Sequence, residues 1–146
     1  MRRAIVVALA LVLASALLTA VRAAPAAPVG TWLTADREGL IRIDPCGAGL
    51  CGRIVGMTWP EGERPPTDVQ GRPQCGLRIL DARPGAADRW AGRITDPENG
   101  RTYDAQLWLD EAGRLHLRGY VGLPLFGATQ VWTAYRAPAP KDCRLS

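Results

Sequence analysis

The chain has 146 residues and a formal net charge of +4, with 22% charged and 6% aromatic side chains. This length suits one domain with a single core and excludes a second domain. After residue 23 the arginines are scattered singly along the chain, which argues against a nucleic-acid partner.

The first segment has the features of a secretory signal peptide. Arg2 and Arg3 precede an apolar run over residues 4–18, and Val21-Arg22-Ala23 resembles a cleavage site. We expect cleavage after Ala23, which removes three of the 18 basic residues and leaves a net charge of about +1. The run is shorter than an ordinary membrane span. The mature domain, residues 24–146, is therefore expected to be soluble, without a membrane span, and periplasmic or secreted.

The mature domain consists of short β-type runs separated by Gly, Pro, Asp and Asn, which is typical of an all-β protein. The inner-face residues of two runs are Leu115, Leu117, Gly119 and Val121, and Tyr103, Ala105, Leu107 and Leu109. Turn formers with a glycine at 36–39, 96–100 and 110–113 predict an up-and-down order. Eight such strands avoid exposed edges best by closing into a small antiparallel β-barrel, either filled or holding one small ligand. The expected strands are Thr31–Thr34, Leu40–Asp44, Leu50–Met57, Gly76–Asp81, Arg89–Thr95, Thr102–Asp110, Arg114–Val121 and Thr129–Tyr135.

The four cysteines, Cys46, Cys51, Cys75 and Cys143, are expected to form disulfides because the domain is exported. Three pairings are possible on paper. We favour Cys46 with Cys51, because a tight turn can bring them together, which leaves Cys75 for Cys143 in the tail. A metal site is not expected, since the sequence has no CxxC pair and no histidine near the cysteines.

One connection, residues 58–74, is 17 residues long and contains four prolines. Such a loop is either a lid or binding element, or a loosely ordered insertion. Trp59 favours the first interpretation. After the last strand, residues 136–146 are expected to form a semi-rigid tail held at Cys143.

The Gly30-Thr31-Trp32 pattern resembles the closed end of calycin barrels such as lipocalins. The expected role is structural: Trp32 plugs the barrel floor, and Arg136 stacks on its indole ring.

Five longer strings stand out: Gly30-Thr31-Trp32, the run 43–55 (IDPCGAGLCGRIV), Gly76-Leu77-x-Ile79-Leu80, Asp96-Pro97-x-Asn99-Gly100-x-Thr102-Tyr103, and the run 119–127 (GYVGLPLFG) before Thr129-Gln130-Val131-Trp132. Together they resemble the exported bacterial proteins of the domain-of-unknown-function 2147 family (DUF2147). The resemblance covers essentially the whole mature chain and implies a periplasmic or secreted calycin-type barrel. It implies no established activity and no catalytic residue. Pro66-Thr67-Asp68 departs from the Asn-Pro-Asp-like turn often found in the family.

Four residues on neighbouring predicted strands form a candidate ligand site: Arg93, Tyr103, Arg118 and Tyr120. An arginine with two phenols in a barrel mouth would hold a carboxylate or phosphate. The alternative is a solvated outer face, which the alternation of Arg93 and Arg118 with apolar neighbours favours.

The connection 119–127 is unusually apolar, with Leu123, Leu125 and Phe126 around Pro124. These side chains either fold over the mouth as a plug or form an apolar rim for a ligand or partner.

An enzyme is not expected. His116 is the only histidine and has no evident partner, Ser146 is the only serine of the mature chain, and no catalytic motif or cofactor signature occurs. A hydrogen-bonded group of His116, an aspartate and Tyr103 in a cleft would reverse this expectation.

The sequence therefore supports two functional hypotheses. The first is a monomeric, disulfide-bonded barrel that binds a small amphipathic or apolar molecule between its mouth and the loops 58–74 and 119–127. The second is an envelope interaction protein with a filled barrel, which presents Trp59, Leu123, Leu125 and Phe126 to another protein.

Overall fold

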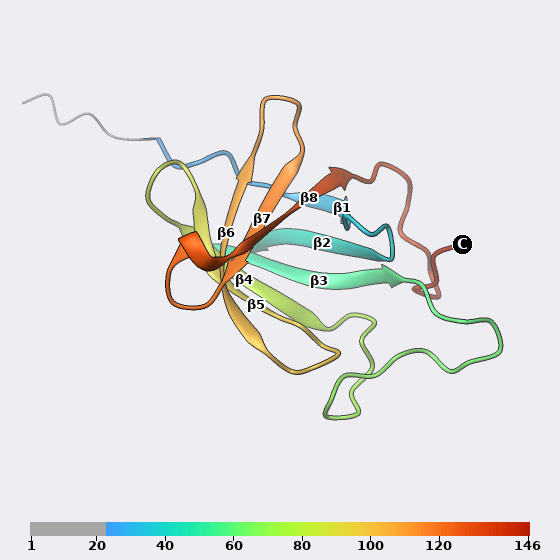
Figure 1. The fold of residues 1–146 in the computed structure, drawn as a ribbon. Coiled ribbons are helices and arrows are strands. Elements are labelled where there is room, and N and C mark those ends of the chain that lie inside the picture. Colours follow the sequence, from blue (N-terminus) through green and yellow to red (C-terminus); the bar gives the residue numbers. More distant parts are fainter. Residues whose placement is uncertain (1–22) are drawn as a thin grey trace, which may run out of the picture.

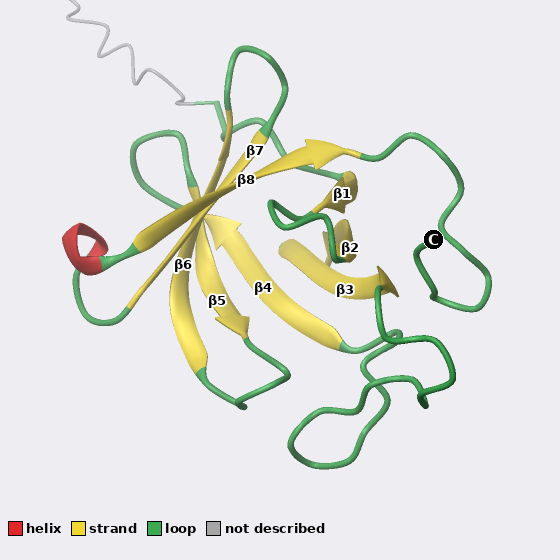
Figure 2. Ribbon diagram, turned by 45° about the vertical axis from the view of Figure 1, so that its right-hand side comes forward, coloured by secondary structure: helices red, strands yellow, loops and turns green. Residues whose placement is uncertain are grey.

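Eight antiparallel strands close into a barrel (Figures 1 and 2). The computed structural model describes residues 23–146, so the expected signal peptide lies outside the described residues except for Ala23. Each strand pairs with the next along the chain, and β8 pairs with β1. The predicted fold class and strand order are confirmed. The strands are β1 (Gly30–Leu33), β2 (Gly39–Cys46), β3 (Gly49–Met57), β4 (Arg78–Pro84), β5 (Trp90–Thr95), β6 (Thr102–Leu109), β7 (Leu115–Tyr120) and β8 (Ala128–Ala134).

One short 3-10 helix, η1 (Pro124–Phe126), precedes β8. Within residues 23–146 no helix is long and apolar enough to cross a membrane.

Local turn chemistry explains where the strands end. In the β6–β7 turn, the Asp110 carboxylate accepts a hydrogen bond from the backbone N–H of Arg114, and Gly113 takes a positive φ of 74°. The β1–β2 turn differs from the prediction, because Arg37 rather than Gly39 takes the positive φ.

All eight strands differ from their predicted ranges at one end or both, and the differences in β4 and β7 have clear physical reasons. β4 begins at Arg78 rather than Gly76, because the positive φ of Gly76 belongs to a turn, and it continues to Pro84. β7 ends at Tyr120, so Val121, which was expected on the inner face, is exposed. Alternation holds only as long as the strand itself continues.

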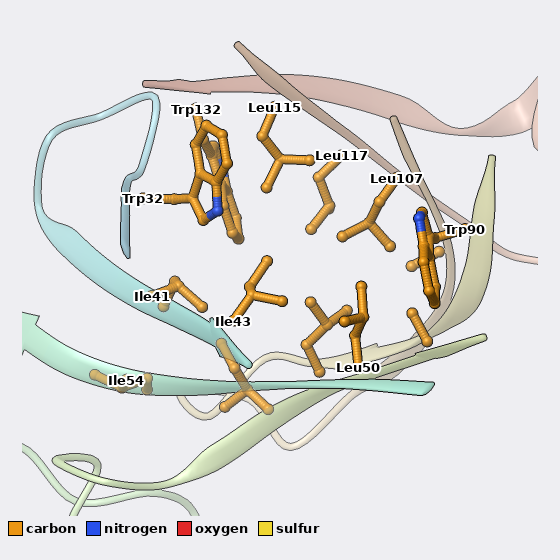
Figure 3. Close-up of a cluster of buried hydrophobic side chains, with 14 of the residues drawn as sticks. Trp32, Ile41, Ile43, Leu50, Ile54, Trp90, Leu107, Leu115, Leu117 and Trp132 are labelled. Carbon is orange, nitrogen blue, oxygen red and sulfur yellow. The ribbon is translucent and has the colours of Figure 1, made fainter. Parts of the chain in front are cut away.

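A hydrophobic core fills much of the barrel interior (Figure 3). Leucine and isoleucine side chains pack between Trp32 and Trp132 on one side and Trp90 on the other. The inner faces of the strands are therefore largely occupied by their own side chains.

The segment before β1 closes one end of the barrel. Trp32 Nε1 donates a hydrogen bond to the Pro28 carbonyl oxygen at 2.9 Å, and Trp90 Nε1 donates to the Ala26 carbonyl oxygen at 3.1 Å. Trp32 is buried, as a floor residue should be. The structure does not bring Arg136 onto its ring, because Arg136 is exposed beyond the end of β8.

Both predicted disulfides are present. Cys46 and Cys51 join across the β2–β3 turn, with a Cα–Cα distance of 5.5 Å, and Cys75 joins Cys143 at 6.1 Å. The Cys143 carbonyl also accepts a hydrogen bond from the Met57 N–H at 2.8 Å. The C-terminal tail is thus fixed to the end of β3 and to the loop that follows it.

The long connection 58–74 is an ordered loop without helix or regular strand. Asp68 is buried and accepts hydrogen bonds from the Arg72 N–H, the Arg72 guanidinium and the Gln70 N–H. Burial raises the pKa of Asp68, but these hydrogen bonds outweigh it and hold the pKa below its ordinary value. Gln74 is buried as well. Polar contacts around Asp68 and Gln74 define the shape of the second half of the loop.

Candidate functional site

The two ends of the barrel differ. Connections alternate between the ends because every strand is antiparallel to its neighbours. The β2–β3, β4–β5 and β6–β7 turns therefore share one end with the N-terminal segment, which closes it. The other end, which we call the mouth, is surrounded by the β1–β2, β3–β4, β5–β6 and β7–β8 connections. Both loops that the sequence singled out, 58–74 and 119–127, belong to the mouth.

A layer of small residues leaves space inside the barrel near the mouth. Ala105 on β6, Gly119 on β7 and Ala128 on β8 lie opposite one another in register. One level deeper, the paired residues Leu107 and Leu117 are buried and fill the interior. A cavity of about 340 Å³ opens beside the small residues, and we call it the mouth cavity. Besides Gly119 and Ala128, its principal lining residues are Ile79, Ile94, Tyr103, Leu117, Gln130 and Trp132.

Few polar groups line the mouth cavity. Gln130 Oε1 accepts a hydrogen bond from Trp132 Nε1 at 2.9 Å, and half-buried Tyr103 supplies a phenol. Asp96 lies at the rim, where its carboxylate accepts the N–H of Glu98 within the β5–β6 turn. An apolar wall with a few placed polar groups is typical of a small-molecule site.

The predicted anion site does not form. Of its four residues only Tyr103 lines the mouth cavity. Arg93 and Tyr120 are paired with Asp104, the residue next to Tyr103, and therefore point to the outer face. Arg118 also lies on the outer face, where its guanidinium donates hydrogen bonds to backbone carbonyls of η1.

Comparisons with known proteins agree with this architecture. The model of a family described as uncharacterised proteins conserved in bacteria, DUF2147, matches residues 30–134. The chain belongs to this family. The solved structure of protein HP1028 from Helicobacter pylori, described as belonging to the lipocalin family, is similar to the DUF2147 barrel with a TM-score of 0.62. The similarity covers 75% of this chain and 84% of that chain at 14% identity, and at this identity it shows the fold alone.

The comparison with curated proteins found no match.

The apolar loop of this DUF2147 protein is exposed and does not plug the mouth. As whole residues, Val121, Leu123, Leu125 and Phe126 are 72%, 61%, 79% and 75% exposed. Trp59 does not join them, because it packs against the core with the Arg144 guanidinium 4.9 Å from its ring centre. The sequence grouped Trp59 with this loop, but the structure assigns it to the attachment of the tail.

His116 has partners that the sequence prediction did not foresee. Its Nε2 lies 3.0 Å from Asp110 Oδ2, and its ring stacks on Trp108 at 5.1 Å between centres. The hydrogen bond from His116, together with the Arg114 N–H, holds the pKa of Asp110 well below its ordinary value. Tyr103 lies inside the barrel, so the suggested catalytic group of these side chains is not assembled.

The sequence prediction missed most of the mouth cavity, including Ile79, Ile94, Gln130 and Trp132. One signal was present. Gly119 interrupts an inner face of leucines, and a glycine within a strand marks a position where a side chain is missing from the packing.

Proposed function

We propose that this DUF2147 protein binds a small apolar or amphipathic molecule in the mouth cavity, and does so in the cell envelope as a periplasmic or secreted protein. The mouth cavity is the observation that carries the proposal. Its volume of about 340 Å³ lies at the lower end of the range for small-molecule sites, and its wall is mostly apolar. The signal-peptide pattern and the two disulfides support export.

We propose binding rather than catalysis, because Asp96, the one carboxylate among the described residues that line the mouth cavity, serves the fold. The Asp96 carboxylate accepts hydrogen bonds from the Glu98 N–H and the Asn99 side-chain amide, both at 2.8 Å, and so builds the β5–β6 turn. The His116 and Asp110 pair lies on the outer face, away from the mouth cavity.

Native mass spectrometry tests the proposal directly. The mature protein, purified gently from its own cell envelope, is expected to carry a stoichiometric small adduct that denaturation releases. A Gly119→Leu variant prepared in the same way is expected to lack the adduct, because its new side chain occupies the mouth cavity. A wild-type protein that carries no adduct and binds no member of a panel of short-chain alcohols, acids and amines would overturn the proposal.

A second candidate function is contact with another envelope protein. It is favoured by the exposed loop of Val121, Leu123, Leu125 and Phe126, whose large apolar side chains face solvent. A photo-crosslinking residue at position 125 is expected to give one defined adduct in whole cells, while the same residue at position 111, in the β6–β7 turn at the other end, gives none. Equal labelling at both positions would contradict a specific loop interface.

A further inference from the structure

A second hollow adjoins the mouth cavity. It has a volume of about 280 Å³ and lies between the β1–β2 turn, the loop 58–74 and the β5–β6 turn. It shares Ile79, Asp96 and Pro97 with the mouth cavity, so the two spaces are neighbours at the same end of the barrel. We call it the acidic annex for the carboxylates that line it.

Four carboxylates line the acidic annex: Asp36, Glu38, Asp96 and Glu98. No Arg, Lys or His of the described chain lines either hollow, although basic residues outnumber acidic ones in the sequence. Among residues 23–146 none of the four carboxylates forms an ion pair. Arg37, in the same turn as Glu38, lines a separate hollow beside the C-terminal tail. The annex therefore carries uncompensated negative charge next to an apolar space.

A buried amide supplies an independent polar feature of the annex. Gln74 lines it and is only 8% exposed. Its Nε2 donates a hydrogen bond to the Thr67 carbonyl oxygen at 3.1 Å, which fixes the amide plane. Within the described residues its Oε1 accepts no hydrogen bond from the protein. Because no buried side-chain oxygen of the described residues lacks a partner, this Oε1 is accessible, and it can accept an N–H from a ligand in the annex.

We propose that the ligand of the mouth cavity is a cationic amphiphile with a protonated amine, whose apolar body occupies the mouth cavity and whose ammonium group occupies the acidic annex. This inference rests on the proposed binding function and adds the class of ligand. The carboxylates attract the charge, the apolar wall takes the hydrocarbon, and Gln74 Oε1 accepts one ammonium proton.

Isothermal titration calorimetry with matched eight-carbon probes tests the charge preference. The probes are octylammonium, octyltrimethylammonium, octanol and octanoate, each below its micelle concentration, at low ionic strength. Octylammonium is expected to bind about tenfold more tightly than octanol, and octanoate most weakly, because the carboxylates that line the annex act on the charge. Octyltrimethylammonium, which has no N–H, is expected to bind less tightly than octylammonium. The preference for the cation is expected to shrink when salt is added.

Two glutamates allow the charge to be removed without damage to the turns. The side chains of Glu38 and Glu98 make no hydrogen bond within residues 23–146, whereas the carboxylates of Asp36 and Asp96 hold their turns together. A Glu38→Gln, Glu98→Gln double variant is expected to show a clearly smaller preference for octylammonium over octanol, because two of the four carboxylates are neutralised. The matched control Glu111→Gln removes an exposed carboxylate at the opposite end of the barrel and is expected to change nothing.

The outcomes separate the two proposals. If octanol or octanoate binds wild type as tightly as octylammonium, the cationic ligand class is overturned and the binding function stands. If the double variant keeps the full preference for the cation, the annex is not where the charge lies, and the inference fails. If no probe binds wild type, the ligand class is refuted, and the binding function is refuted with it when the purified protein also carries no adduct.

Discussion

Replacing Gly119 with leucine gives the sharpest test of the mouth cavity. A Cβ atom built on Gly119 meets only the Tyr103 Cβ, at an ordinary contact distance of 3.9 Å, and Gly119 is not among the residues with positive φ. The new side chain therefore extends into the mouth cavity without backbone strain. The leucine side chain occupies the same space that a ligand would need.

The size of the effect follows from burial. Partial burial of a leucine side chain contributes about 1.5 kcal/mol. Removing a glycine from a strand adds about 0.5–1 kcal/mol to the free energy of unfolding. The conformational entropy lost when the new side chain is ordered lowers it by about as much. The free energy of unfolding is expected to rise by about 1–2 kcal/mol, which raises Tm by about 4–8 °C for a domain of this size. Ligand affinity is expected to fall more than about tenfold, because the added carbons fill the cavity.

Gly92 supplies the matched control, since it is joined to Gly119 through Ala105 in the strand register. A Cβ atom on Gly92 would collide with the Asp81 carbonyl oxygen, so Gly92→Ala is expected to lower Tm. Thermal unfolding of wild type, Gly119→Leu and Gly92→Ala measures the change in Tm, and isothermal titration calorimetry measures the change in ligand affinity. If Gly119→Leu lowers Tm as Gly92→Ala does, the space beside Gly119 is not open. If it binds ligand as wild type does, the site lies elsewhere.

Three further predictions concern the fold. Cys143→Ala is expected to lower the free energy of unfolding by about 4 kcal/mol and Cys51→Ala by about 2 kcal/mol, because the first opens the longer loop; equal losses in urea unfolding would speak against this reasoning. Because the hydrogen bond from His116 holds the pKa of Asp110 below its ordinary value of 3.8, the stability from ionised Asp110 is present above about pH 4 and lost as pH falls further. The Tm deficit of Asp110→Asn should therefore shrink between pH 5 and pH 2, and a deficit that stays constant would show that the ionised form is not favoured. Trp90→Phe removes the hydrogen bond to the Ala26 carbonyl oxygen and is expected to lower the free energy of unfolding by about 1 kcal/mol. It is also expected to speed amide hydrogen exchange in the segment before β1, and unchanged exchange would show that this bond does not fix that segment.

The strand order and the disulfides could be predicted from the sequence because both depend on local features. Alternation fixes which face of a strand points inward, and turn residues such as Asp110 and Gly113 fix where strands end. The pairing of Cys46 with Cys51 follows from their short spacing, and the remaining pair follows by elimination.

The site could not be predicted to the same degree because it depends on register between strands. Ala105, Gly119 and Ala128 form one layer only through the pairing of three strands, and no single segment reveals it. The proposed grouping of Tyr103 with Arg118 set aside the alternation that places them on opposite faces. Alternation could have separated them, whereas the mouth cavity required the structure.

The bond between Cys75 and Cys143 turns residues 75–143 into a covalent ring, and every residue that lines the mouth cavity, from Ile79 to Trp132, belongs to that ring. Cys143 follows all eight strands, so the ring can close only after the sequence of the whole barrel is available and the two cysteines have been oxidised. Closure then limits how far β4 to β8 can separate when the barrel opens transiently. Oxidation of these two cysteines is therefore the last covalent step that fixes the wall of the mouth cavity, and in a reduced chain strand pairing alone would hold that wall together.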